Sequence, residues 1–230
     1  SEFVDEQHGE KLGIGSSAAL TVALARVLAP DDSIDEIAAY AQSAHRAFQG
    51  GAGSGVDIAT SVTGGLIEYR MPEREIAAIS WPDELHYALL WSGVAVSTRE
   101  RLERLAQPED AKPQASRPAL AASADATAAA WRSTSAAQVV DATRDYVDAL
   151  QAFSVDHGLG IFEAGHGTLV RNAMTTATVY KPCGAGGGDL GIALATSADD
   201  LRDFVGRATE TGFTRLSIAL DTQGVSFHHE

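Results

Sequence analysis

The apolar positions near the start of the chain follow helical periods. Residues 18–28 (AALTVALARVL) are apolar almost all round, which predicts a buried helix. A second helix is expected from Ser33, which would cap it together with Glu36 three residues later, to about Phe48. A third, shorter helix is expected over Val56–Thr63, because two glycines follow it directly.

Further along the chain, short β-rich runs alternate irregularly with alanine-rich helical segments. The run at 159–169 has no clear period, and the proline-rich stretch 107–118 is expected to be a loop. Strands and helices without strict alternation favour an α+β fold. Strands are expected at 66–70, 87–91, 175–180, 192–195 and 215–220, and helices at 98–105, 119–132, 136–153 and, capped by Ser197, 199–211.

Composition narrows the class of protein. The chain has 230 residues, 45% apolar and 21% charged, as is usual for a globular protein. With 17 basic and 31 acidic residues its net charge is −14, which argues against a nucleic-acid partner, because displacing counterions from phosphates needs a basic face. A phosphorylated small molecule stays compatible with this charge, since a pocket can be locally basic.

The expected compartment is the cytoplasm. The single cysteine, Cys183, cannot form an intramolecular disulfide, which fits a reducing environment. No apolar run approaches the roughly 20 residues that a membrane helix needs, and the acidic, polar residues 1–11 do not resemble a signal peptide. We therefore expect neither a membrane nor a nucleic-acid partner; a homodimer is left open.

The first candidate site is a glycine-serine run directly before the first helix. Glycines can turn tightly and approach a ligand, and the free N–H groups of a helix N-terminus favour an anion such as phosphate. The run lacks the Gly-Lys-Ser/Thr of a P-loop, and Ala18 breaks the dinucleotide fingerprint. The alternative is a tight turn with a serine cap. The residues concerned are Gly13, Gly15, Ser16, Ser17 and Ala18.

Two further runs combine glycine with an aspartate. Four glycines within Gly184–Gly188 precede Asp189 and could form a nest of N–H groups for an oxyanion; the alternative is a flexible linker. The other run, Gly53-Ser54-Gly55-Val56-Asp57, opens the third helix. On composition alone, Asp57 is more simply explained as a first-turn aspartate stabilised by the helix dipole.

Taken together and in this order, the motifs resemble those of the GHMP superfamily of small-molecule kinases. KLGIGSSAAL resembles the family's ATP-binding motif, GSGVD followed by TGGLIEY the segment with the catalytic aspartate, and KPCGAGGGDLGIAL its third motif. Asp189, AHRAFQG at 44–50 and WSG at 91–93, which leads to Ser97-Thr98, resemble the phosphomevalonate kinases of this superfamily.

The resemblance implies a fold and a domain division. It implies an N-terminal domain like part of ribosomal protein S5, here residues 1–80, and a ferredoxin-like C-terminal domain at 81–230. The family's first motif, which carries a lysine near the reacting phosphates, has no counterpart in these 230 residues. We therefore expect the chain to lack the first part of such a kinase, and its activity by itself stays open.

The resemblance also implies roles for the motif residues. Gly13, Gly15, Ser16, Ser17 and Ala18 would bind the phosphates of ATP, Ser17 would be a Mg²⁺ ligand, and Asp57 would be the catalytic residue acting on phosphomevalonate in isoprenoid precursor synthesis. Gln49 stands where related kinases have a metal-holding glutamate. Substrate contacts would come from Ser54, Gly55, Ser97, Thr98, Gly184, Ala185, Gly186, Gly187 and Asp189.

Several alternatives remain at this point. Ser97 and Thr98 are equally consistent with a helix cap, Lys181 and Arg171 with ordinary surface residues, and Cys183 with a small packing residue. Another acceptor such as mevalonate, or a non-catalytic nucleotide-binding member of the fold, would share the same motifs. A nicotinamide-dependent oxidoreductase is disfavoured, because the fingerprint and its acidic partner are missing.

Overall fold

The structure is a computed structural model that describes residues 12–50, 53–96, 105 and 115–226. The chain forms two compact units. Of the described residues, those within 14–80 and 219–226 form the smaller unit, and those within 12–13 and 81–218 form the larger one. Among the helices in the described ranges, none is both long and apolar enough to cross a membrane.

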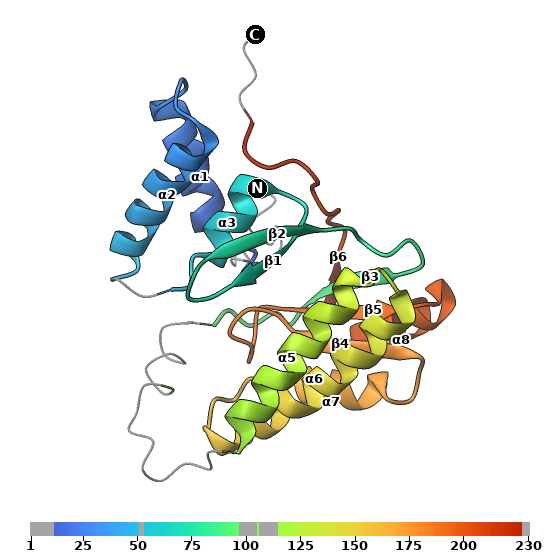
Figure 1. The fold of residues 1–230 in the computed structure, drawn as a ribbon. Helices are drawn as coiled ribbons and strands as arrows, with labels where there is room; N and C mark the ends of the chain where they lie inside the picture. The colour runs from blue at the N-terminus through green and yellow to red at the C-terminus, as the bar shows by residue number, and fades with distance from the viewer. Residues whose placement is uncertain (1–11, 51–52, 97–104, 106–114, 227–230) are drawn as a thin grey trace. The chain divides into compact units, whose positions relative to one another are not determined.

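The smaller unit begins with three helices whose boundaries follow the sequence pattern. They are α1 (Ser16–Leu28), α2 (Ile34–Phe48) and α3 (Val56–Thr63). The predicted capping box is present at α2: Ser33 Oγ accepts a hydrogen bond from the Glu36 N–H at 3.3 Å, and the Glu36 carboxylate accepts one from the Ser33 N–H at 2.8 Å. These bonds satisfy donors that the helix itself leaves unpaired. Figure 1 shows the three helices in shades of blue to cyan.

A two-stranded antiparallel sheet completes the smaller unit. The strand β1 (Leu66–Arg70) was expected, whereas its partner β2 (Glu75–Ile79) was not, because its alternation is weak. The chain then returns to this unit at its end: Val225 N–H donates to the Val62 carbonyl at 3.2 Å.

The last strand was predicted at 215–220, which is too long. Only Thr214–Leu216 (β6) is a strand.

The expectation that the first helix is buried all round is wrong. In α1, Ala18 and Val22 pack with Ala41 and Ile58 in the core of the smaller unit. The opposite side of the helix is exposed, and Leu28 has 82% of its surface accessible. The apolar side chains on that side recur every three to four residues, so they form one stripe that this unit leaves uncovered: Leu20, Leu24, Val27 and Leu28.

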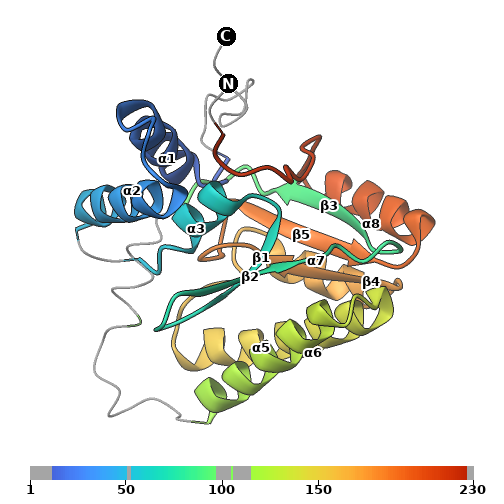
Figure 2. The same cartoon turned by 45° about the horizontal axis from the view of Figure 1, so that its top comes forward.

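The larger unit is a four-stranded antiparallel sheet with helices packed on it. The strand order is β4-β5-β3-β6, and Figure 2 labels the first three of these strands. Helical segments separate β3 from β4 and β5 from β6 along the chain. This is the split order of a ferredoxin-like fold, which agrees with the expected class. The elements are β3 (His86–Trp91), α5 (Ser116–Arg132), α6 (Ala136–Asp156), α7 (His166–Ala173), β4 (Thr178–Pro182), β5 (Leu190–Ala195), α8 (Ala198–Glu210) and β6.

The core of the larger unit lies between the sheet and helices α6, α7 and α8. Leu90 and Ala193 from the strands, Val139 from α6, Leu169 from α7 and Phe204 from α8 are all fully buried. Helix α5 packs along α6 instead of on the sheet. Helix α7 begins inside the segment 159–169, for which no clear period was found. It has only eight residues, which is too short to produce a recognisable period. The predicted helix at 98–105 lies almost entirely outside the described residues.

Candidate active site

The glycine-serine run forms the N-terminus of α1. Gly15 caps the helix in a left-handed conformation (φ 78°), and its carbonyl accepts hydrogen bonds from the N–H groups of Ala18 and Ala19. No side chain caps this end, so the alternative of a serine cap is wrong. Ser16 and Ser17 are the first two residues of the helix, and Ser17 is exposed. The helix end therefore offers partial positive charge and hydroxyls rather than a finished cap.

Asp57 occupies the first turn of α3, as the sequence suggested. A glycine, Gly55 (φ 85°), caps that helix, and a Cβ added there would clash with the amide of Gln42 on α2. The close approach of the two helices thus explains this glycine. Asp57 Oδ1 accepts a hydrogen bond from the Ile58 N–H at 3.0 Å, and about a third of the side chain (34%) is exposed.

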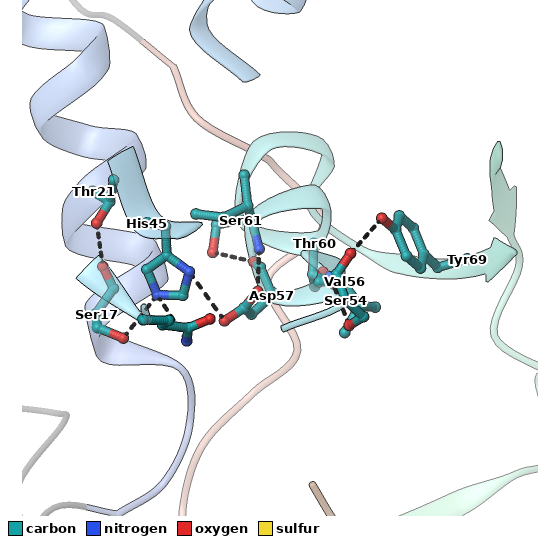
Figure 3. A network of polar contacts seen from close by, with 11 residues as sticks. Ser17, Thr21, His45, Ser54, Val56, Asp57, Thr60, Ser61 and Tyr69 are labelled. Carbon is teal, nitrogen blue, oxygen red and sulfur yellow. Dashed lines mark hydrogen bonds and ion pairs between the residues drawn. The ribbon is translucent and has the colours of Figure 1, made fainter. Parts of the chain in front are cut away.

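A buried histidine joins these two helix ends. His45, in the last turn of α2, has only 2% of its surface exposed. Its Nε2 lies 3.2 Å from Ser17 Oγ, and its Nδ1 lies 3.7 Å from Asp57 Oδ2, as Figure 3 shows. The amide nitrogen of Gln49, one turn further on, lies 3.5 Å from Nε2. The structure therefore brings Ser17 and Asp57, predicted from separate motifs, to the two sides of one imidazole.

The loop before α3 is held by the neighbouring strand. Tyr69 on β1 donates its hydroxyl to the Ser54 carbonyl at 2.8 Å, and the Ser54 hydroxyl accepts from the Val56 N–H at 3.3 Å (Figure 3). Both Gly55 and Ser54 thus belong to an ordered turn beside Asp57. Their side-chain and backbone groups are positioned by α2 and β1, not by the loop alone.

Sequence reasoning did not assign a role to His45. Its signal is the spacing Ile37, Ala41, His45, which places the histidine in line with two buried residues of an amphipathic helix. A polar ring on an apolar helix face must find hydrogen-bond partners inside the protein. That requirement could have marked His45, although it could not have identified Ser17 and Asp57 as the partners.

In the larger unit the second glycine run is an ordered loop, so the linker alternative is wrong. The N–H of Gly187 donates to the Ile161 carbonyl at 2.6 Å, and that of Gly186 to the Cys183 carbonyl at 3.1 Å. Asp189 has a positive φ of 51°, and its N–H donates to the Val94 carbonyl at 2.7 Å. The N–H groups of Gly186 and Gly187 are therefore used inside the unit, and the expected anion nest is not open at these two donors.

A second buried histidine supports this loop from inside the unit. His166 is fully buried; its Nδ1 lies 2.7 Å from the Tyr180 hydroxyl and its Nε2 3.0 Å from the Gly188 carbonyl. Because a carbonyl only accepts, Nε2 carries the proton and Nδ1 accepts from the tyrosine. Burial raises the pKa of Tyr180 far above its ordinary value, so the hydroxyl remains a donor.

The segment that follows β3, residues 92–96, runs beside the glycine loop. Ser92 N–H donates to the Asp189 carbonyl at 2.9 Å, and a Cβ on Gly188 would clash with the Val94 carbonyl. Gly13 also lies near this loop: a Cβ there would stand 2.7 Å from Asp189 Cγ. Ser97 and Thr98 themselves lie outside the described residues.

The remaining candidates have local partners. Lys181 Nζ donates to the Pro182 carbonyl at 2.9 Å and lies 5.6 Å from the centre of the Tyr146 ring, and Arg171 donates to Thr168 Oγ1 at 3.0 Å. Burial raises the pKa of the Cys183 thiol, against an opposing effect of Lys181. A neutral thiol is a poor nucleophile, which agrees with a packing role for Cys183.

Comparison with known proteins assigns the family. The GHMP kinases N terminal domain matches residues 4–65. Phosphomevalonate kinase from Streptomyces sp. (strain CL190) is 30% identical over 95% of this chain and 67% of its own length. A Lin0012 protein from Listeria innocua has a TM-score of 0.83 at 22% identity (93% and 68% covered), and Streptococcus pneumoniae phosphomevalonate kinase one of 0.76 at 18% (94% and 70%).

The chain thus belongs to the GHMP kinases, a family of small-molecule kinases. It spans about two thirds of the length of the relatives it matches. A relative that matches nearly the whole of this chain is a phosphomevalonate kinase.

Proposed function

We propose that this chain takes part in ATP-dependent phosphoryl transfer to phosphomevalonate, which yields diphosphomevalonate. The observation that carries the proposal is the meeting of Ser17 and Asp57 at His45, because it unites a glycine-capped helix end with a carboxylate in one unit. The acceptor is suggested by the similarity to the Streptomyces enzyme over nearly the whole chain.

ATP would bind through its phosphates at the start of α1. Gly13, Gly15, Ser16, Ser17 and Ala18 form or precede a helix end that has no side-chain cap, so its N–H groups and dipole favour negative charge. The Streptococcus pneumoniae enzyme was solved with phosphomevalonate and AMPPNP, an ATP analogue, which supports nucleotide binding by this fold.

Mg²⁺ would accompany ATP as part of the substrate. Among the described residues, no three or more histidine, cysteine or acidic side chains are grouped so that they could hold a metal ion. Mg²⁺ often takes few protein ligands, and we propose that phosphate oxygens and water would supply most of its ligands here. The exposed Ser17 hydroxyl is the oxygen that would contact it. Mg²⁺ would neutralise charge on the transferring phosphoryl group.

Asp57 would orient the acceptor. The attacking atom of phosphomevalonate is a phosphate oxygen, which is already largely ionised near neutral pH because its second pKa is about 6. Proton abstraction therefore contributes little, and alignment of the two phosphates contributes most. The motifs suggest the following acceptor-binding residues: Ser54, Gly55, Ser97, Thr98, Gly184, Ala185, Gly186, Gly187 and Asp189.

The test is ADP formation by the purified protein with Mg²⁺–ATP, comparing phosphomevalonate with mevalonate, and with AMPPNP binding measured separately. Turnover that requires phosphomevalonate is the expected result. Turnover with mevalonate instead would transfer the assignment to a mevalonate-type kinase, a fold neighbour being the Leishmania major enzyme solved with R-mevalonate (TM-score 0.67, 20% identity). Because the family's first motif has no counterpart in these residues, the assay is repeated with a segment that carries this motif. Nucleotide binding that is still without turnover on either acceptor would indicate a non-catalytic member of the fold.

A further inference from the structure

Three helices of the smaller unit converge on His45, and each contributes one polar group. Ser17 comes from the first turn of α1, His45 from the last turn of α2, and Asp57 from the first turn of α3. The imidazole is buried, but Ser17 is exposed and Asp57 is a third exposed. A buried ring thus contacts two groups that a ligand can reach.

The partners assign the tautomer of His45. Nδ1 faces Asp57 Oδ2 at 3.7 Å, which is longer than a hydrogen bond. Because an ionised carboxylate can only accept hydrogen bonds, it favours the neutral tautomer whose proton is on Nδ1. In the neutral ring Nε2 is then an acceptor. The Gln49 amide nitrogen at 3.5 Å agrees with this, because it presents hydrogen atoms to Nε2. In this tautomer Ser17, at 3.2 Å from the same nitrogen and closer than the Gln49 amide, donates its hydroxyl hydrogen to His45.

This assignment determines what Ser17 can offer to a ligand. A hydroxyl has one hydrogen and two acceptor lone pairs. Once its hydrogen is used by Nε2, the exposed Ser17 oxygen presents only lone pairs to an incoming group. That is the form that binds a cation, and a hydroxyl free to rotate would adopt it only part of the time.

We infer that His45 is a positioning residue that sets the Ser17 hydroxyl as an acceptor and at the same time orients the Asp57 carboxylate. The inference rests on the proposed function and deepens it: His45 connects the nucleotide side of the site to the acceptor side. It touches neither substrate, and its two ring nitrogens serve the two sides separately.

Two substitutions separate the two nitrogens. The amide of asparagine reaches as far as Nδ1, so His45→Asn keeps a donor for Asp57 and removes the acceptor for Ser17. The amide of glutamine reaches as far as Nε2, so His45→Gln keeps the acceptor for Ser17 and removes the donor for Asp57. Groups that orient metal ligands typically change affinity or activity about 10–100-fold when they are lost.

The expected result is a split between affinity and turnover. For His45→Asn, the Kd of Mg²⁺–AMPPNP should rise about tenfold or more, with kcat changed much less. For His45→Gln, kcat should fall about tenfold or more while the nucleotide Kd changes little. In a Ser17→Ala background His45→Asn should no longer weaken AMPPNP binding, because the two residues act through one contact.

A matched control is His157→Gln. His157 is also buried, at the C-terminus of α6, where its ring packs 4.3 Å from that of Phe153, far along the chain from the motif residues. This variant should lower the melting temperature without any split between Kd and kcat. If both His45 variants behave in the same way, with losses in Kd and kcat that follow stability, His45 is only structural and the inference is wrong.

A spectroscopic measurement tests the tautomer without any turnover. Long-range ¹H–¹⁵N correlation spectra of the wild-type protein should show His45 protonated at Nδ1 and bare at Nε2. The opposite tautomer would overturn the inference even in an active enzyme. Conversely, a wild-type protein that binds AMPPNP but uses neither acceptor, even when a segment with the family's first motif is supplied, would refute the proposed reaction. The tautomer and the Kd values would still decide the role of His45.

Discussion

Each unit of this protein contains a buried histidine with both ring nitrogens in polar contacts, but the two surroundings differ. His166 in the larger unit contacts the Tyr180 hydroxyl at 2.7 Å and the Gly188 carbonyl at 3.0 Å, and aromatic rings enclose it. His45 in the smaller unit makes longer contacts, of 3.2 and 3.7 Å, with Ser17 and Asp57. The partners also assign opposite tautomers, with the proton on Nε2 in His166 and on Nδ1 in His45.

The difference separates a structural role from a functional one. The partners of His166 are themselves buried, so its hydrogen bonds are complete before any ligand arrives. The partners of His45 reach solvent, and their contacts leave room to shorten when a ligand binds. Polar contacts at active sites are often long in the ligand-free state and tighten in the complex. We therefore expect changes around His45 to affect turnover and changes around His166 to affect stability.

The largest expected effect is the loss of activity in Asp57→Asn. The variant keeps the shape and the helix position of the side chain but removes the charge that faces His45. We expect kcat to fall by about 10²-fold or more with little change in melting temperature, because a small misplacement of the acceptor costs about this much. Steady-state ADP formation and thermal unfolding provide the two measurements.

The control is Asp35→Asn, which alters an exposed aspartate in the first turn of α2. It changes the same charge near a helix N-terminus, so it reproduces the dipole contribution and should leave turnover unaffected. An Asp57→Asn protein with nearly full activity would remove this residue from the mechanism and leave only its first-turn role.

The next effect is a loss of stability in Tyr180→Phe. Removing the hydroxyl leaves His166 Nδ1 without its donor inside the core, which costs about 1–3 kcal/mol. In a chain of this size each kcal/mol lowers the melting temperature by roughly 2–4 °C. Turnover per folded molecule should stay within about twofold of the wild type if the closed cluster is purely structural.

Tyr69→Phe is the matched deletion in the smaller unit, where the hydroxyl donates to the Ser54 carbonyl in a solvent-accessible bond. Its cost in stability should be smaller, because water can replace the lost partner. Equal losses from Tyr180→Phe and Tyr69→Phe would mean that the cluster around His166 is not closed, and the contrast between the two units would fail.

The ends of helices were predictable where a local sequence motif, such as a capping box or a glycine pair, determines them. Ser33 with Glu36 fixed the start of α2, and the Gly64-Gly65 pair fixed the end of α3. The strand β2 and helix α7 were not predicted, since their formation depends on pairing with β1 and packing on the sheet rather than on local pattern. The exposed stripe of α1 was mistaken for core because hydropathy does not reveal which faces meet a partner.

The sequence motifs predicted the residues of the candidate site, but they did not predict which of these residues contact one another. Order and spacing pointed to Ser17 and Asp57 separately. Their link through His45 depends on how three helices pack, and such long-range contacts leave no mark in local sequence. The same holds for the glycine loop: four glycines suggested a nest, whereas its Gly186 and Gly187 N–H groups are donated to carbonyls that local pattern could not identify.

The smallest expected effect is on the reactivity of Cys183, a half-buried residue three positions after Tyr180 in the larger unit. Burial raises the pKa of this thiol, so at a given pH the thiolate fraction is lower than in a free cysteine, and reactivity should increase only at more alkaline pH. Iodoacetamide labelling of the native protein at pH 7.5 should be several-fold slower than labelling of the urea-unfolded chain, which is the internal control. Cys183→Ser should abolish labelling and leave turnover nearly unchanged, because no step of the proposed reaction uses the thiol. Native labelling at neutral pH as fast as that of the unfolded chain would show that the surroundings of Cys183 do not suppress its thiolate, contrary to the raised pKa.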